Sequence, residues 1–206
     1  MPAPTQLPAL RETDVDADPI RQFAAWFEAA ATAGIEQPEA AALATANADG
    51  APSVRMVLVK AVDQRGFRFF TNYASRKGRE LAVNPRAALA FYWGPLGRQV
   101  RATGTVSRTT REETIDYAHS RPRGSQLSAL ASPQSEAIPS RDTLEARVAE
   151  LSARFGDGEL PVSEQWGGFC LDPQTVELWQ QRPDRLHDRL LYSRVSGGWR
   201  LERLAP

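Results

Sequence analysis

The residues best suited to chemistry lie near the C-terminus, where Arg185, His187 and Arg189 alternate in the run Arg185-Leu186-His187-Asp188-Arg189. We expect a strand over residues 185–193, in which alternate side chains point to the same face. Two guanidinium groups beside an imidazole suit an anionic ligand, and the imidazole can titrate near neutral pH. The alternative is a solvated cationic strand face, which is the commoner role of such a triplet.

A second cationic segment, Ser75-Arg76-Lys77-Gly78, follows an expected strand that ends near Asn72. Ser75 can cap a helix whose free backbone amides and positive dipole end favour an anion. Arg76 and Lys77 add formal positive charge at the same place. The segment therefore suits a phosphate group, although an ordinary capped surface helix fits the same four residues equally well.

An apolar run with a cation at each end, Arg55-Met56-Val57-Leu58-Val59-Lys60, has the composition of a strand. Arg55 and Lys60 are separated by an odd number of positions, so a flat strand would direct them to opposite faces. Either a bulge intervenes, or the two cations contact different parts of a large ligand, or one of them faces a partner subunit.

A third polar group surrounds the run Ser120-Arg121-Pro122-Arg123-Gly124-Ser125, which we interpret as a loop at a helix end. Tyr117 precedes the loop by one helical turn. The guanidinium and hydroxyl groups here are of the kind that bind a phosphate monoester. Gln134 and Ser135 follow shortly after, and Gln99 opens another expected strand with both a donor and an acceptor.

The composition narrows the classes of function. A chain of 206 residues fits one domain with a sizeable core. Its 25 Lys and Arg residues balance 25 Asp and Glu residues, so we expect no binding of nucleic acid. The single cysteine, Cys170, excludes an internal disulfide, and with only two histidines we expect no metal site. No signal-peptide pattern or membrane-length apolar run is present, so we expect a cytoplasmic protein without membrane contact.

Short strands are the main elements expected to position these residues. Residues 1–17 are predicted to form a flexible arm, followed by a single domain over residues 18–206. Strands are expected at 41–48, 53–62, 67–72, 87–93, 99–106, 166–171, 174–180, 185–193 and 198–203. Consecutive strands joined by tight turns favour an antiparallel barrel.

Helices are expected where capping signals occur. Asp18 and Pro19 predict one helix start, and a capping box formed by Thr110 and Glu113 predicts another. Ser140 can cap a further helix. The stripe on that helix that we expect to be buried comprises Leu144, Val148, Leu151 and Phe155.

Taken in order, these segments resemble the pyridoxine/pyridoxamine 5′-phosphate oxidases, flavin enzymes that make pyridoxal 5′-phosphate. The most specific part is Trp179-Gln180 followed by Arg185-Leu186-His187-Asp188-Arg189, and the resemblance extends from about Asp18 to Arg203-Leu204-Ala205-Pro206. It implies a mainly β fold with peripheral helices, namely an FMN-binding split antiparallel β-barrel. It also implies a homodimer with FMN in the cleft between the subunits.

The resemblance also assigns site residues. The FMN-binding residues would be Arg55, Met56, Val57, Leu58, Val59, Lys60, Phe70, Thr71, Arg76, Lys77, Gln99, Gln134, Ser135, Trp179 and Arg189, some of them supplied by the partner subunit. The substrate-binding residues would be Lys60, Tyr117, Arg121, Ser125, Arg185 and His187. Within that set, Tyr117, Arg121 and Ser125 would hold the substrate phosphate, and Arg185 and His187 would be the catalytic residues at the reacting end.

The implied reaction is hydride transfer from C4′ of pyridoxamine or pyridoxine 5′-phosphate to FMN, with O2 as the electron acceptor. Two alternatives remain, a related flavin oxidase of the phenazine-pathway type and a non-catalytic carrier of FMN or pyridoxal phosphate. The sequence departs from the family pattern at Leu130 and Leu178. Its short N-terminal arm also lacks the Arg-Arg-Glu-Tyr-like segment that covers the substrate in some relatives.

Overall fold

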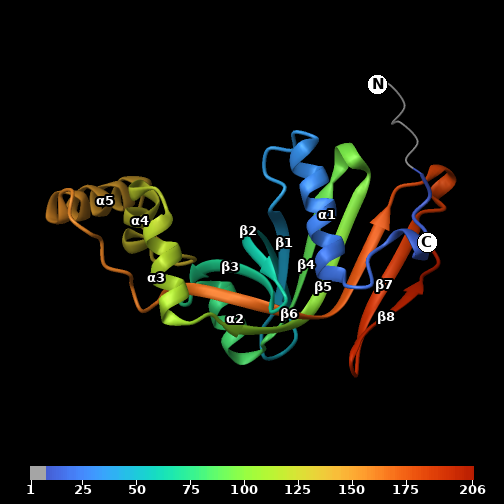
Figure 1. Cartoon of the computed structure of the whole chain (residues 1–206). Helices are drawn as coiled ribbons and strands as arrows, with labels where there is room; N and C mark the ends of the chain where they lie inside the picture. The colour runs from blue at the N-terminus through green and yellow to red at the C-terminus, as the bar shows by residue number, and fades with distance from the viewer. Residues whose placement is uncertain (1–7) are drawn as a thin grey trace.

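The computed structural model of the chain describes residues 8–206, in which the strands form one continuous antiparallel sheet (Figure 1). The strands are β1 (Ala40–Ala46), β2 (Pro52–Asp63), β3 (Gly66–Asn72), β4 (Arg86–Trp93), β5 (Arg98–Arg108), β6 (Trp166–Gln180), β7 (Asp188–Val195) and β8 (Gly198–Arg203). Their order is β3-β2-β1-β4-β5-β6-β7-β8, and an additional pairing joins β3 to β6. The strands from β3 to β6 therefore close into a six-stranded barrel, which confirms the predicted antiparallel barrel.

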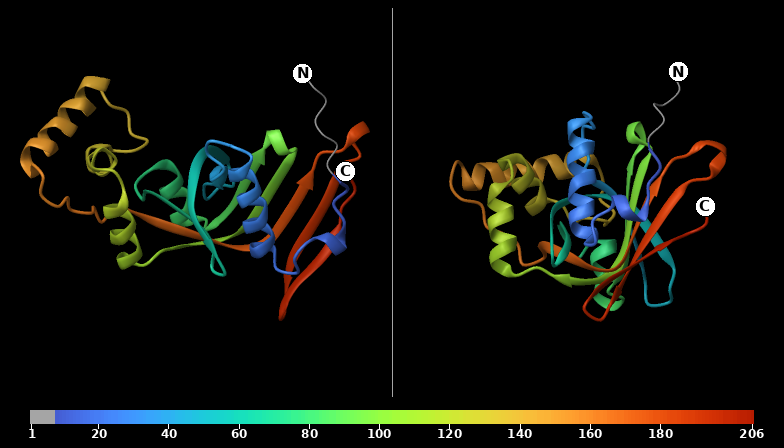
Figure 2. Two further views of the ribbon diagram at one scale, coloured as in Figure 1. Left: turned by 45° about the horizontal axis from the view of Figure 1, so that its top comes forward. Right: turned by 45° about the vertical axis from the view of Figure 1, so that its right-hand side comes forward.

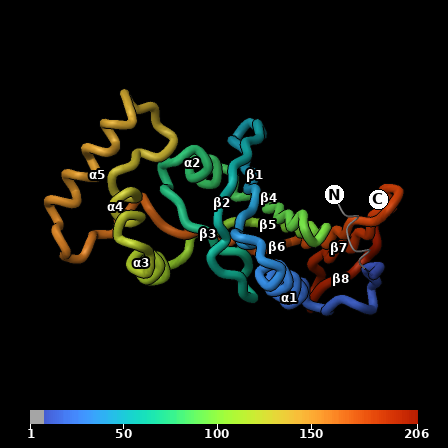
Figure 3. Tube along the Cα trace, turned by 90° about the horizontal axis from the view of Figure 1, so that it is seen from above, coloured from blue at the N-terminus to red at the C-terminus, as the bar shows by residue number. Residues whose placement is uncertain are grey.

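The helices lie around this barrel. They are α1 (Pro19–Thr32), α2 (Arg76–Val83), α3 (Arg111–Ser120), α4 (Arg123–Ala131) and α5 (Arg141–Phe155), with short 3-10 turns η1 (Glu12–Asp14), η2 (Gly94–Leu96) and η3 (Pro183–Arg185). Helices α3, α4 and α5 gather at one end of the molecule and β7 and β8 at the other, with the barrel between them (Figures 2 and 3). No helix in the described part of the chain has the length and apolar character needed to cross a membrane.

Helix α1 packs directly on the barrel core. Asp18 caps it by accepting a hydrogen bond from the Ile20 N–H (2.8 Å), as the sequence predicts. The Phe23 ring lies 5.0 Å from the ring of Phe67 and 4.9 Å from that of Phe91, between centroids. The buried aromatic rings thus join the helix to β3 and β4.

Strand β6 is the longest strand of the described chain, and the sequence reading divides it wrongly into two. Residues 166–171 of β6 pair with β3, whereas residues 175–180 pair with β7. Both halves pair with β5 on the other edge, and the register with β5 shifts between Thr103 and Gly104. Pro173 lies opposite Gly104 at this irregularity, so a residue without an N–H interrupts the ladder without ending the strand.

Gly104→Ala is expected to lower the free energy of unfolding by about 3 kcal/mol, because overpacking against backbone has no cheap relief. A Cβ at this position would lie 2.0 Å from the carbonyl oxygen of Asp172. Urea denaturation followed by fluorescence measures the change. Gly124→Ala in α4 is the control, since nothing lies within 4 Å of its added Cβ, and its stability should stay within about 1 kcal/mol of the original. Equal effects of the two substitutions would contradict the argument.

The predicted strand at 185–193 begins only at Asp188, so Arg185 and His187 lie outside it. Asp184 and Arg185 have φ values of 56° and 61°, which extended backbone does not adopt. Pro183 begins a turn here, and its carbonyl accepts a hydrogen bond from the Leu186 N–H (3.1 Å). The prediction that Arg185, His187 and Arg189 share one strand face is therefore wrong.

The supposed loop after residue 120 is also wrong, because Arg123–Ala131 forms helix α4. Pro122 precedes its first turn, a position that suits proline, and Leu127 and Ala131 are buried one turn apart. Helix α5 begins at the predicted cap, Ser140. Its expected apolar stripe is only half-buried. Helix α5 packs mainly against α4 and not against the barrel.

Residues 1–7 of the expected flexible arm lie outside the described residues. Residues 8–17 lie against the C-terminal strands. The Leu10 N–H donates a hydrogen bond to Asp188 Oδ2 (3.1 Å), and the Arg203 guanidinium pairs with Glu12 (2.8 Å). These contacts hold the described part of the arm against β7 and β8.

Candidate functional site

A cavity of about 390 Å³ lies where β2 and β3 meet α3 and α4. Many of the residues predicted from the sequence line it, namely Met56, Val57, Leu58, Lys60, Phe70, Thr71, Lys77, Tyr117, Arg121 and Gln134. The sequence reading missed five others, which are Asn72, Ser128, Ala129, Ser132 and Trp166. The cavity thus brings together predicted cofactor-binding and substrate-binding residues from segments far apart in the chain.

A β-bulge resolves the parity of Arg55 and Lys60. The register between β2 and β3 shifts between Val59 and Ala61, which leaves Lys60 as the extra residue. Of the three alternatives, the bulge is therefore present. The two cations still contact different groups, because Lys60 Nζ pairs with Glu39 at the cavity (3.1 Å) while Arg55 points into a separate polar network.

Three aromatic rings and one guanidinium form a wall of the cavity. The Phe70 ring stacks on the Tyr117 ring at 3.9 Å, and the Trp166 ring is nearly parallel to that of Tyr117 at 6.2 Å. The Arg121 guanidinium lies 4.8 Å above the Trp166 ring. A flat apolar surface beside a fixed cation suits a planar ring that carries an anionic substituent.

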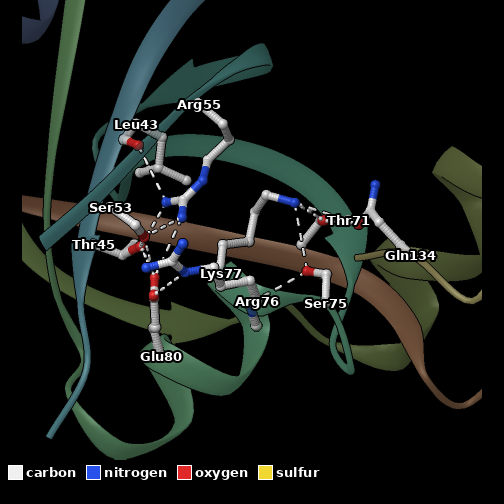
Figure 4. A network of polar contacts seen from close by, with 11 residues as sticks. Leu43, Thr45, Ser53, Arg55, Thr71, Ser75, Arg76, Lys77, Glu80 and Gln134 are labelled. Carbon is white, nitrogen blue, oxygen red and sulfur yellow. Dashed lines mark hydrogen bonds and ion pairs between the residues drawn. The ribbon is translucent and has the colours of Figure 1, made fainter. Parts of the chain in front are cut away.

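A buried ammonium lies beside this wall (Figure 4). Lys77 is 8% exposed, and its Nζ donates hydrogen bonds to Thr71 Oγ1 (3.0 Å) and Gln134 Oε1 (3.3 Å). Within residues 8–206 it has no carboxylate partner in an ion pair. Burial, together with the charge of Arg55, lowers the pKa of Lys77 to about 8. A buried cation with only neutral acceptors fits a phosphate that would supply the missing negative charge.

Next to Lys77, a carboxylate holds two arginines. Glu80 is buried and accepts hydrogen bonds from Ser53 (2.6 Å), Thr45, Arg55 (3.3 Å) and Arg76 (2.9 Å) (Figure 4). Burial by itself would raise the pKa of Glu80, but these hydrogen bonds outweigh it and lower the pKa to about 2. The carboxylate therefore stays ionised, and the arginines keep a fixed counter-ion.

The helix that carries this cluster begins as predicted. Ser75 caps α2 by accepting a hydrogen bond from the Gly78 N–H (3.3 Å), and it is fully buried. The first amides of α2 and the three cations of the cluster consequently lie at one corner of the barrel, where the donors needed to bind an anionic group are concentrated.

A second group of predicted residues lies elsewhere. Gln99, Trp179 and Arg189 stand opposite one another on β5, β6 and β7 and form one row across the sheet. The His187 ring lies 4.6 Å from the Trp179 ring, and Arg189 pairs with Glu177 (2.9 Å). None of these residues lines the cavity described above.

The backbone fixes the tautomer of His187. The N–H of Arg182 donates a hydrogen bond to His187 Nδ1 (3.1 Å), and a backbone N–H can only be a donor. Nδ1 therefore carries the lone pair, so that the proton of the neutral ring is on Nε2. In this state His187 offers its Nε2–H as a donor to a ligand, while its Nδ1 lone pair accepts from the backbone.

Strand β6 sets the distance between the two groups. Trp166, beside Arg121, begins the strand, and Trp179, beside His187, is its penultimate residue. At about 3.3 Å per residue the two tryptophans are up to roughly 40 Å apart. One chain therefore presents two half-sites, a cavity half-site around Arg121 and a C-terminal half-site around His187, which cannot hold one small ligand together.

Some predicted residues lie in neither half-site. Ser125 lies in the first turn of α4, where its N–H donates to the Pro122 carbonyl (2.8 Å), and it does not line the cavity. Ser128 and Ser132, farther along α4 and just after it, do line the cavity. The signal for them was the helical spacing that places residues three or four positions apart on one face. Ser135 is exposed with a positive φ of 74°.

Comparisons with known proteins cover nearly the whole chain. A family model described as pyridoxamine 5′-phosphate oxidase matches residues 27–155, and one described as pyridoxine 5′-phosphate oxidase C-terminal dimerisation region matches residues 166–206. The chain is 55% identical to the pyridoxine/pyridoxamine 5′-phosphate oxidase of Rubrobacter xylanophilus, over 96% of this chain and 91% of that protein. It is 54% identical to the protein of the same name from Salinibacter ruber, over 96% and 93%.

Solved structures show the same likeness. PhzG from Burkholderia lata, in complex with tetrahydrophenazine-1-carboxylic acid, superposes with a TM-score of 0.92 at 33% identity, covering 98% of this chain and all of that one. A pyridoxamine 5′-phosphate oxidase-related, FMN-binding protein from Nostoc punctiforme gives a TM-score of 0.73 at 19% identity, covering 91% and 98%. The second likeness concerns the fold alone.

Proposed function

This chain belongs to the pyridoxamine 5′-phosphate oxidase family, and we propose on that premise that its cavity is the FMN and substrate site of one subunit. The protein is an oxidoreductase with the FMN-binding split-barrel fold of the family. It oxidises pyridoxine and pyridoxamine 5′-phosphate to pyridoxal 5′-phosphate. The observation that carries the site assignment is the cavity, which gathers an aromatic wall, Lys60, Lys77 and Arg121.

The dimer completes the site. The segment 166–206 is a dimerisation region, and the protein is a homodimer. We assign one catalytic centre to the cavity half-site of one chain together with the partner subunit's Arg185 and His187. Three large apolar side chains on β2 and β4 are exposed in the single chain, namely Val54 (69%), Met56 (65%) and Tyr92 (63%). Their exposure supports a partner subunit on the face of the sheet that carries them.

FMN fits the donors present in the cavity half-site. The buried ammonium of Lys77, the Thr71 hydroxyl and the Arg55–Glu80–Arg76 cluster would hold its phosphate. The bound cofactor would supply the redox chemistry, namely uptake of a hydride from C4′ of the substrate and transfer of the electrons to O2. The residues of this chain contribute by fixing the substrate against the flavin and by excluding water.

The His187 ring has a defined role in this arrangement. Because Nδ1 is occupied by the Arg182 N–H, the Nε2–H group would donate to the amine or alcohol of the substrate and orient it. Arg185 is two residues before His187 in the sequence, and it and Asp184 have left-handed backbone. Both residues would act on the reacting end, while Tyr117 and Arg121, which line the cavity, would hold the phosphate end.

Arg121→Met is expected to raise the KM for pyridoxamine 5′-phosphate roughly 10- to 100-fold, because a hydrogen bond to a charged group contributes about 1.5–3 kcal/mol. Its kcat should change little, since the phosphate lies far from the reacting carbon. Steady-state oxidase kinetics separate the two constants. Arg123→Met is the control, because Arg123 binds the Gly158 carbonyl (2.8 Å) outside the cavity. A normal KM in the Arg121 variant would remove Arg121 from the phosphate site.

The purified enzyme should be yellow, and anaerobic pyridoxamine 5′-phosphate should bleach it. Admission of air should restore the colour and release pyridoxal 5′-phosphate. Colour without bleaching would favour a carrier of FMN.

The likeness to PhzG keeps a second candidate function, an oxidase of a tetrahydrophenazine carboxylic acid. Bleaching of the flavin by that compound but not by the phosphate esters would favour this second candidate.

We place the enzyme in the cytoplasm, as expected for vitamin B6 metabolism.

A further inference from the structure

Glu80 occupies the centre of a polar network that the assigned residues do not explain (Figure 4). Its side chain is 7% exposed, yet it remains ionised because hydroxyl groups from β1 and β2 and two arginines donate to it. One oxygen, Oε2, accepts from Thr45, Ser53 and Arg55, and the other, Oε1, accepts from Arg76. A single carboxylate thus ties helix α2 to two strands.

Three cations converge around this carboxylate. Arg55 arrives from β2, while Arg76 and Lys77 begin α2. The charge of Arg55 already disfavours the charged form of Lys77, which shows that the cations are close enough to repel one another. Within residues 8–206, Glu80 is the only carboxylate that forms an ion pair with any of these three cations, and it therefore opposes that repulsion before an anion arrives.

Glu80 accepts a hydrogen bond from only one of the three guanidinium nitrogens of Arg76. Glu80 binds the Nε of Arg76 at 2.9 Å, and the two terminal nitrogens of Arg76 make no hydrogen bond within the described residues. Glu80 therefore fixes the guanidinium through Nε and leaves both terminal nitrogens of Arg76 available to a ligand. The Arg76 side chain is 63% exposed, so the contact with Glu80 is what restrains it.

We propose that Glu80 is a positioning residue for the phosphate of the cofactor, which orients Arg55 and Arg76 and keeps the three cations together in the apoprotein. The inference rests on the proposed function, in which these cations and Lys77 hold the phosphate. Glu80 itself does not touch the phosphate, because like charges would repel. It acts through the arginines.

The test compares FMN with riboflavin, which has the same ring system and no phosphate. Glu80→Gln keeps the size and one acceptor oxygen but turns an amide NH2 toward an arginine donor. For apoprotein prepared by removal of the flavin, the FMN dissociation constant should rise at least about 10-fold, as expected when a charge-assisted hydrogen bond is lost. The riboflavin constant should change less than about 2-fold. Quenching of flavin fluorescence measures both constants.

Glu113→Gln is the matched control, since Glu113 also bridges two arginines, Arg65 (2.6 Å) and Arg68 (2.9 Å), away from the cavity. It should lower the melting temperature of the apoprotein and leave both flavin constants unchanged. If Glu80→Gln does not fold, Glu80→Asp retains the charge with a shorter reach and should show the same selective loss of FMN affinity.

The outcomes separate two failures. Equal weakening of FMN and riboflavin would make Glu80 a merely structural residue and overturn the inference, as would unchanged FMN binding. If the unmodified apoprotein bound riboflavin as tightly as FMN, the phosphate assignment in the proposed function would fail instead. A selective loss of FMN affinity in the Glu80 variants alone supports both.

Discussion

Lys77→Met is expected to raise the FMN dissociation constant by about 100-fold or more, because truncating one partner of a buried charge pair costs about 2–5 kcal/mol. Lys77 is nearly inaccessible to water, and its hydrogen-bond partners in the described part of the chain are the neutral acceptors Thr71, Ser75 and Gln134, so the cofactor phosphate would be its counter-ion. Fluorescence titration of the apoprotein gives the constant. The apoprotein itself should not be destabilised, since the substitution removes a buried unpaired charge.

The pH dependence follows from the pKa of Lys77, which the fold lowers from 10.5 to about 8. Below pH 8 the lysine is protonated in both the folded and the unfolded apoprotein. Between pH 8 and 10.5 the unfolded chain binds more protons, so the stability of the apoprotein should rise with pH through this window. FMN affinity should fall over the same window, because the neutral amine no longer attracts phosphate.

These two trends have opposite signs, and both should disappear in Lys77→Met. Thermal melts of the apoprotein and FMN titrations at pH 7, 8, 9 and 10 test both trends. Steps of about one pH unit bracket the titration of Lys77. An FMN constant that stays flat across this range in the unmodified protein would contradict the assignment of Lys77 to the phosphate.

His187→Ala is expected to lower kcat by about 10²–10³-fold while FMN remains bound, since loss of one oriented donor at the reacting centre costs about 2.7–4 kcal/mol. The flavin absorbance of the purified variant reports occupancy, and single-turnover bleaching reports the reductive step. His119→Asn is the control, because His119 lies on the surface of α3 and contacts the Leu160 carbonyl (3.2 Å). Its turnover should be normal.

The same control makes the tautomer visible. The chain has only two histidines, so His119→Asn leaves His187 as the sole imidazole in a ¹⁵N spectrum. The hydrogen bond from the Arg182 N–H requires an unprotonated Nδ1 and a protonated Nε2. A neutral ring with its proton on Nδ1, or unchanged turnover in His187→Ala, would remove the donor role.

Local signals predicted the helix starts well. Asp18, Ser75 and Thr110 each cap a helix where the sequence places it, because a cap is a contact between residues two or three positions apart. The turn before β7 was missed for the opposite reason. Alternating residue types favour a strand, and the alternation of Arg185, His187 and Arg189 gives no sign of the left-handed backbone at Asp184 and Arg185.

Contacts between elements far apart in the chain could not be predicted from the residue pattern. The stack of Phe70, Tyr117 and Trp166 joins β3, α3 and β6, and no periodicity relates these elements. The parity of Arg55 and Lys60 left three alternatives open and could not by itself select the bulge. The grouping of distant residues into one site came from the family resemblance, which did not include Trp166 or Glu80.

In the arrangement that we propose, the length of β6 makes the two catalytic centres of the dimer interdependent. Each centre would take the Trp166 end of one β6 and the Trp179 end of the other, so an isolated chain would contain every required residue and still have no complete centre. A mixed dimer, with Arg121 replaced in one chain and His187 in the other, would combine both defects in one centre and leave the second centre intact. Two inactive alleles of this enzyme could therefore complement each other, an outcome that a site confined to one chain would forbid.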